Sequence, residues 1–398
     1  MQQLFLIAVP LVALSMFATS AQAATIDFSS TPAMQATCGE LRPRPAATLR
    51  TDDEKVAYVI CSGIDLLTDT ARWARGMSKR MESSNPQERD RGFVQGIRIK
   101  LEEILVKLTA ARQILTTVRA TKPLFVIQPG EWEIDIDGDG TITPFEKHFF
   151  WVAKRDDNQI AAFSGINSPN EYYERQFIKP VIKLDQSDVY WAAAYLNFAE
   201  AALNLVLSYN VDLAGKDVVV LNDEKRVAMR AYPRLLEGIA TSRRLRESLL
   251  KETDNDREWI PNPKQTQTSF PLVLDAQSFA TWGQLLEHMD ALFRGRTLLG
   301  GAPAASRPGE AQAWRSRDLT MGLCAPGEGI NVRDLFLRPL RRPLDAGERA
   351  ARCVKPTAAV PFTGLGKLIE DSLRRNAGRT PDNPTGEWMV LRHLYWVN

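Results

Sequence analysis

Three aspartates alternate with other residues between Asp135 and Glu146, the part of the chain best suited to chemistry. Asp135, Asp137 and Asp139 each offer a carboxylate, and alternate residues of a tightly turned loop can aim their side chains at one point. Such hard oxygen ligands suit Ca²⁺, which takes about six to eight of them. Gly140 follows where the sharp turn needs a residue without Cβ. Without a cation, the three carboxylates would repel one another.

The rest of this stretch supplies further oxygens. Thr141 would give its backbone carbonyl, Thr143 would ligate directly or through water, and Glu146 could reach back with both carboxylate oxygens. At these positions the stretch resembles the calcium loop of EF-hand proteins. The resemblance implies one Ca²⁺ ion held by six residues: Asp135, Asp137, Asp139, Thr141, Thr143 and Glu146.

The end of the loop has a second interpretation. Residues Thr143 to Glu146 form a capping box with Pro144 at the first helical position, which predicts a helix from Pro144 to about Lys154. A capping box does not explain the three aspartates. The Pro- and Gly-containing residues 129–134 are a poor helix, so the resemblance covers the loop and the exit helix only. A lone loop is expected to bind weakly, with a Kd of about 10⁻⁴–10⁻³ M, which suits a structural or slow regulatory ion.

The first 23 residues have the pattern of a secretory signal peptide. An apolar run extends from Leu4 to Phe17 apart from Ser15, and Ala21-Gln22-Ala23 supplies a cleavage site of small residues. The run is shorter than the roughly 20 residues that a membrane-spanning helix needs. We therefore expect cleavage after Ala23 and a periplasmic or secreted protein with no transmembrane segment after cleavage. An uncleaved anchor or a core helix is the alternative.

Export changes the interpretation of the cysteines. Four are present, an even number that predicts disulfides in an oxidising compartment, and they allow three connectivities. Loop closure is least demanding for Cys38–Cys61 with Cys324–Cys353, which we therefore favour. Free, buried cysteines are the alternative. No C-x-x-C spacing occurs, so neither redox chemistry nor zinc is indicated.

Composition and charge exclude some partners and leave the activity open. The chain has 398 residues and a net charge of +2, which gives no electrostatic case for nucleic acid. Its three histidines form no ligand pair, and no nucleophile or phosphate-loop signature occurs, so an enzyme is uncertain and less favoured. Glu131 or Glu133 could pair with Glu200 as acid–base carboxylates, but the sequence gives no geometry for this.

Hydrophobic periodicity predicts a mainly α fold, an irregular multi-helix assembly with one EF-hand-type calcium loop and a loop-rich C-terminal region. Residues 52–83 and 86–118 should form an antiparallel helical hairpin, with Asn85 as the N-cap of its second helix. Further helices are expected at 187–209, 223–252 with a kink or break at Pro233, 276–294 and about 365–375. Residues 24–51 should be irregular, 125–127 could be a short strand, and 217–221 should be a lone strand or an extended link.

These elements suggest a division of the chain. The signal peptide occupies 1–23, and the N-terminal segment with the hairpin occupies 24–120. The calcium loop and its exit helix follow at 121–155, a helical region at 156–295 and the loop-rich region at 296–398. Residues 24–398 could also form one domain. We expect the ion to stabilise the join between 52–120 and 143–295.

Three functional hypotheses remain open. The first is an exported calcium-binding protein whose ion stabilises or regulates a scaffold for an unknown protein or envelope partner. The second is a calcium-stabilised envelope enzyme. The third is a helical protein that binds a solute, favoured by a cavity against the aromatic stripe Trp191, Tyr195 and Phe198, which is otherwise core. The acidic residues 254–258 are interpreted as a solvated helix end.

Overall fold

The computed structural model describes residues 25–83, 86–153, 177–211, 219–222, 227–271, 274–300, 324–325, 327–343 and 345–368. The fold is mainly α, which confirms the predicted class. The predicted signal peptide and the N-cap at Asn85 lie outside the described residues.

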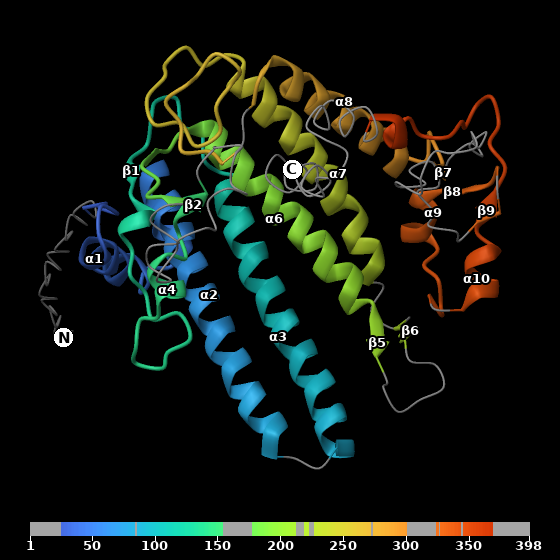
Figure 1. Cartoon of the computed structure of the whole chain (residues 1–398), viewed down its shortest axis with the longest axis horizontal. Coiled ribbons are helices and arrows are strands. Elements are labelled where there is room, and N and C mark those ends of the chain that lie inside the picture. The colour runs from blue at the N-terminus through green and yellow to red at the C-terminus, as the bar shows by residue number, and fades with distance from the viewer. Residues whose placement is uncertain are drawn as a thin grey trace, which may run out of the picture.

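A row of long helices forms the body of the molecule. Helix α2 (Asp52–Ser83) and helix α3 (Pro86–Leu115) run antiparallel, as predicted, and α6 (Gln186–Leu207) packs against α3 (Figure 1). Helix α7 (Val227–Leu249) packs on α6, and α8 (Ala276–Phe293) packs on α7. Three acidic residues in the first turn of α2 favour its start, because they face the positive end of the helix dipole.

The N-terminal segment is not irregular, contrary to the prediction. Helix α1 (Thr31–Leu41) begins at Ser30, whose side chain accepts a hydrogen bond from the backbone N–H of Ala33. It buries Met34 and Cys38, and the short helix η1 (Ala46–Thr48) follows it. The apolar face of α1 is too short to stand out in a polar, proline-containing segment, so periodicity did not reveal this helix.

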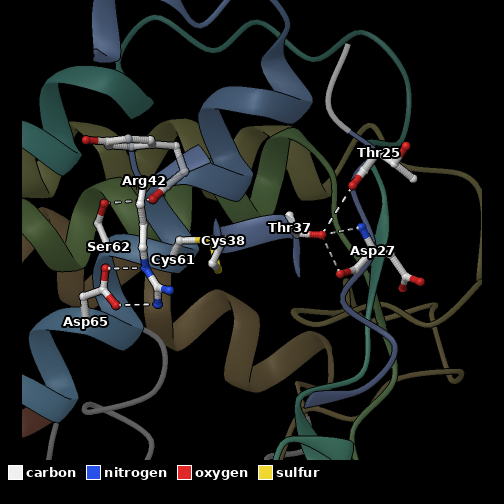
Figure 2. The surroundings of a disulfide bond; sticks show 9 residues. Thr25, Asp27, Thr37, Cys38, Arg42, Cys61, Ser62 and Asp65 are labelled. Atoms are coloured by element: carbon white, nitrogen blue, oxygen red, sulfur yellow. Dashed lines mark hydrogen bonds and ion pairs between the residues drawn. A yellow bond between two sulfur atoms is a disulfide. The ribbon is translucent and has the colours of Figure 1, made fainter. Parts of the chain in front are cut away.

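Helix α1 is fixed to α2 by the predicted Cys38–Cys61 disulfide (Figure 2). Beside it, both Arg42 nitrogens Nε and Nη2 bind the Asp65 carboxylate, at 2.9 and 2.6 Å. At the opposite side of α1, the Thr37 hydroxyl donates to the Asp27 carbonyl at 2.9 Å. Together these contacts hold the first described residues against the start of α2.

Proline does not interrupt α7. The helix continues through Pro233, so the predicted alternative of a break is wrong. Pro233 removes the hydrogen bond to the carbonyl of Met229. Met229 is exposed and lies in the first turn, where water can satisfy that carbonyl. Helix α8 ends before Gly295, whose φ of +71° favours glycine.

Strands in the described residues are two or three residues long and pair antiparallel. Strand β1 (Val126–Ile127) pairs with β4 (Ile182–Lys183), and β2 (Val152–Ala153) pairs with β3 (Phe177–Ile178). Strand β5 (Tyr209–Val211) pairs with β6 (Val219–Leu221). The predicted strand at 125–127 is therefore present as β1, and within 217–221 the strand alternative holds for β6, which is paired with β5 and not alone.

The described part of the C-terminal region is more ordered than predicted. Strands β7 (Leu299–Gly300), β8 (Gly329–Ile330) and β9 (Cys353–Val354) form a small sheet. Helices α9 (Val332–Leu337) and α10 (Ala346–Ala350) lie between β8 and β9. The predicted Cys324–Cys353 disulfide is present. Residues 365–368 are helical, and the rest of the helix expected there lies outside the described residues.

The hydrophobic core lies where α1, the first half of α2, and α6 to α8 meet. Fully buried side chains include Phe28, Ile239 and Leu286. Among the described residues, no helix is both long and apolar enough to span a bilayer.

Candidate metal site and its surroundings

The loop from Asp135 to Glu146 is tightly turned and folded around its own carboxylates. Gly138 and Gly140 have φ angles of +71° and +89°, a region that favours glycine. The Asp135 carboxylate accepts hydrogen bonds from the backbone N–H groups of Asp139 and Gly140, at 3.0 and 2.9 Å. These contacts bend the chain so that its alternate side chains turn inward.

The three aspartates come together. One carboxylate oxygen from each of Asp135, Asp137 and Asp139 lies within 4.8 Å of the others. The Thr141 hydroxyl and backbone N–H donate to Asp139 at 2.6 and 2.8 Å, and these hydrogen bonds lower the pKa of that carboxyl. These hydrogen bonds therefore favour the charged form of Asp139, which lies close to the other two carboxylates.

Glu146 is placed differently from the aspartates. It is 5% exposed, and its Oε1 accepts hydrogen bonds from the backbone N–H groups of Ile136 and Asp137, at 2.8 and 3.3 Å. Its Oε2 accepts from the backbone N–H and the hydroxyl of Thr143, both at 2.9 Å. Burial raises the pKa of Glu146, but these hydrogen bonds outweigh it and the pKa is lowered overall. The carboxylate joins the two ends of the loop.

The helix that leaves the loop is shorter than predicted. Helix α4 (Pro144–Lys147) is a single turn with the expected capping box between Thr143 and Glu146. At its end His148 is buried, with its Nδ1 2.6 Å from the Pro144 carbonyl. Residues 148–153 are not helical, so the predicted extension of this helix is wrong over those residues. Lys154 lies outside the described residues.

Aromatic packing closes the base of the loop. Trp132 precedes the loop in sequence and Phe150 follows α4. Their rings pack edge to face, with ring centroids 5.3 Å apart. The Trp132 indole N–H donates to the Phe28 carbonyl at 3.0 Å. This packing replaces the entering helix of an EF-hand, which the sequence already argued against.

Helix α2 supplies positive charge to the loop, which lies beside it (Figure 1). Arg75 forms ion pairs with Asp137 at 3.4 Å and with Asp139 at 3.6 Å. The side chain of Arg72 lies against Gly138, where an added Cβ would meet its Nε at 2.6 Å. These arginines did not stand out in the sequence, because they lie about sixty residues before the loop.

The donor set fits Ca²⁺. It consists of hard oxygens, with three carboxylates already convergent and a fourth, Glu146, at the adjoining end of the loop. Thr141 and Thr143 occupy positions from which a carbonyl and a hydroxyl could complete the set. No soft ligand of the kind that zinc or copper prefers lies within the loop.

A second acidic cluster lies far from the first in sequence and was missed. Carboxylate oxygens of Asp185, Glu252 and Glu258 lie within 4.8 Å of one another. Asp188 adjoins them, because its Oδ2 accepts the backbone N–H of Asp185 at 3.1 Å. Glu258 is buried, so the interpretation of 254–258 as a solvated helix end is wrong for this residue.

Burial dominates the electrostatics of this second cluster. It raises the pKa of Asp185, raises that of Asp188 well above its ordinary value, and raises those of Glu252 and Glu258 to about 7. The neighbouring carboxylates add to the effect by repulsion. Asp188 and Glu258 are buried and Asp185 and Glu252 are half-buried, so a proton is the readiest way to neutralise each group.

Raising the pH from about 5 to about 8 is expected to destabilise the protein through this cluster. The pKa values of Glu252 and Glu258 are each about 7 in the folded chain, against an ordinary value of 4.5. Between these values the folded state binds more protons than the unfolded state, so the free energy of unfolding falls as pH rises. The contribution is fully present below about pH 4.5 and is lost as the pH passes about 7. Urea unfolding across this range measures it.

Matched variants distinguish the pH dependence of this cluster from that of the other carboxyl groups of the protein. Glu252→Gln combined with Glu258→Gln should reduce the pH dependence to the part that Asp185 and Asp188 contribute, whereas Glu247→Gln on the exposed side of α7 should leave it unchanged. An unfolding free energy that rises from pH 5 to pH 8, or a slope that the double change leaves unaltered, would contradict the assignment.

The carboxylates considered for acid–base catalysis are not brought together. Glu131 pairs with Lys179 at 2.8 Å, and Glu133 pairs with Lys147 at 3.6 Å. Glu200 instead pairs with Arg112 on α3, inside the helix row. The structure therefore gives no support to a catalytic pair among these three residues.

A largely apolar cavity of about 360 Å³ lies beside the second cluster. Its walls come from α2, the start of α6, strands β1 and β4, and residues 149–152. Trp191 of the predicted aromatic stripe lines it and meets Trp259 edge to face at 5.8 Å. One residue of the stripe, Trp191, therefore forms part of the cavity wall, so the stripe does not belong to the core alone.

Comparison of the chain with protein-family models, with curated proteins and with solved structures gave no match. The functional interpretation therefore depends on the geometry of these two sites.

Proposed function

We propose that the protein is an exported calcium-binding helical protein, in which one Ca²⁺ ion in a lone EF-hand-type loop stabilises or regulates a scaffold. The observation that carries the proposal is the convergence of Asp135, Asp137 and Asp139 on a loop with glycines at positive φ. Thr141, Thr143 and Glu146 would complete the ligands. The ion would neutralise carboxylates that now depend on Arg75 and on backbone N–H groups.

Export is supported by the two disulfides, which fit an oxidising environment outside the cytoplasm. The signal-peptide pattern of residues 1–23 favours the periplasm or secretion, with cleavage after Ala23. Weak calcium affinity would suffice in such a compartment.

Titration of Ca²⁺ into the purified, metal-stripped mature chain tests the proposal. Calorimetry is expected to give one site with a Kd of about 10⁻⁴–10⁻³ M, and calcium is expected to raise the melting temperature. Asp135→Asn should weaken binding, because the loop loses a ligand charge and one of the two oxygens that accept backbone N–H groups. Absence of a binding heat and of a melting shift would leave an acidic turn that only caps α4.

Removing Arg75 is expected to tighten calcium binding. Its guanidinium competes with the ion for Asp137 and Asp139, and both pairs are partly exposed. Exposed pairs are weak, so Arg75→Gln should lower the calcium Kd about threefold to tenfold. Arg42→Gln, which removes a pair to Asp65 away from the loop, is the control. Equal affinities in native and Arg75→Gln proteins would show that the arginine does not share the site.

A second candidate function, a helical ligand-binding protein, is favoured by the cavity beside Trp191. A volume of about 360 Å³ lies within the range of small-molecule sites. The two functions are compatible, because Phe150 both closes the base of the calcium loop and lines the cavity.

A further inference from the structure

The cavity offers a ligand mainly apolar and aromatic contact. Among the described residues that line it, Asp188 is the one ionisable group, and Trp151, Trp191 and Trp259 supply large flat surfaces. Residues of α2 and the end of α3 face the cavity with aliphatic side chains. Such walls would bind a hydrophobic body, and the single carboxyl would orient it.

Asp188 is a buried carboxyl with spare hydrogen-bonding capacity. It is 8% exposed, and its Oδ2 accepts one hydrogen bond, from the backbone N–H of Asp185. No hydrogen bond from another described residue reaches its Oδ1. A ligand group in the cavity can therefore contact this oxygen without displacing a partner within the described structure.

The carboxyl groups around Asp188 have no cation among the described residues to balance them when they ionise. Asp185, Glu252 and Glu258 adjoin it, and none of these carboxylates forms an ion pair with a described residue. Lys183 on β4 lies nearby but pairs with Asp254 at 3.6 Å and Asp256 at 3.2 Å. The N-terminus of α6 adds only about half a positive charge. Buried carboxylates need either protons or a cation, so the cavity should favour positively charged ligands.

We propose that this cavity binds a hydrophobic organic cation, a primary amine on an aromatic or alkyl body, with its ammonium group against Asp188. The ammonium would donate a hydrogen bond to Oδ1 of Asp188. It would also supply the positive charge that no described residue places beside this carboxyl. The faces of Trp191 and Trp259 would attract the cation, because the aromatic face carries negative charge density. The proposal rests on the second candidate function and names its ligand class.

Three probes of similar size and different charge test the proposal. The full mature chain is titrated, with calcium present, with one probe of each charge. The cation is benzylamine or 2-phenylethylamine, the neutral probe is 2-phenylethanol and the anion is phenylacetate. Tryptophan fluorescence and calorimetry report binding. The amines are expected to bind at least about tenfold more tightly than the alcohol, and the anion least tightly. Saturating calcium keeps the occupancy of the Asp135–Glu146 loop the same in all of these titrations.

A matched pair of variants locates the amine. Asp188→Asn should weaken amine binding at least about tenfold and leave alcohol binding within about twofold. Asp254→Asn is the control, because its side chain is exposed and does not line the cavity. Unchanged amine affinity in a folded Asp188→Asn protein would overturn the assignment to this carboxyl.

A pH profile of the native protein tests the same proposal if the variant does not fold. Among the described residues, the charged groups that act on Asp188 are Asp185 before α6 and Glu252 and Glu258 after α7. Lys183 on β4 acts on Glu258, and the cavity-lining residues of α2, α3 and 149–152 are apolar. Protons compete with the ammonium for these carboxyls, so amine affinity should fall from pH 8 to pH 5.5 while alcohol affinity stays constant.

The outcomes distinguish the two levels of the proposal. Equal binding of amine and alcohol would keep a ligand cavity but overturn the cation. No binding of any probe up to about 10 mM would overturn both, since a preformed site of this size should hold such ligands. A second calcium step in calorimetry that Glu258→Gln removes would mark a metal site there and overturn the amine.

Discussion

Glu200→Gln is expected to lower the free energy of unfolding by about 3–5 kcal/mol, the largest stability change that we predict. The Nε of Arg112 on α3 lies 2.5 Å from the Glu200 carboxylate on α6, and the side chains are 12% and 4% exposed. Loss of the carboxylate leaves a guanidinium inside the helix row without its ion pair. Urea unfolding of the native and variant proteins measures the difference.

Two further variants show whether the charge or the shape is responsible. Arg112→Met combined with Glu200→Leu should recover most of the loss, because no buried charge is then left unpaired. Glu133→Gln removes an exposed pair and should change stability by less than about 1 kcal/mol. A Glu200→Gln protein as stable as this control would mean that water reaches Arg112.

Long periodic helices were the most predictable elements. The predicted span of 52–83 coincides with α2, because its apolar spacing and acidic first turn mark both the face and the start. The disulfide pairing followed from loop closure and is present in the structure. The helix α1 was missed and α4 was overestimated, since both depend on packing that a short segment does not encode. His148, for example, is buried at the end of α4 and contacts the Pro144 carbonyl.

The two candidate sites differ in how much the sequence could reveal. The aspartates of the calcium loop lie within five residues of one another, so their spacing alone predicts that they converge. Asp185, Glu252 and Glu258 converge only because the segments before α6 and after α7 meet in space. An acidic run such as 254–258 resembles a solvated surface until the fold buries Glu258.

Segments on either side of the Asp135–Glu146 loop line the cavity. Pro129 and Phe149 flank the loop on either side and line the cavity, and Trp132 packs on Phe150 between them. An ion that tightens the loop would therefore act on the same segments that contact a ligand. The two proposals can still be tested separately, because Asp188 lies on α6 and Glu146 lies in the loop.

Glu146→Gln is expected to lower calcium affinity by at least about 100-fold, the largest effect on binding that we predict. The change removes a ligand charge and one of two carboxylate oxygens at the closing position of the loop. It also places an amide N–H₂ against backbone donors of Ile136 or Thr143, which should lower the metal-free stability by about 1–3 kcal/mol. Calorimetry gives the first quantity, and urea unfolding in a chelator gives the second.

The two quantities together assign the role of Glu146. Loss of both would mean that one carboxylate serves the metal-free loop through backbone N–H groups and the calcium form as a ligand, so calcium must draw it away from those donors. That exchange would itself weaken calcium binding, in keeping with the low affinity expected of a lone loop. Loss of stability with native calcium affinity would restrict Glu146 to capping α4 and contradict its assignment as a ligand. Glu133→Gln, two residues before the loop, should change neither quantity.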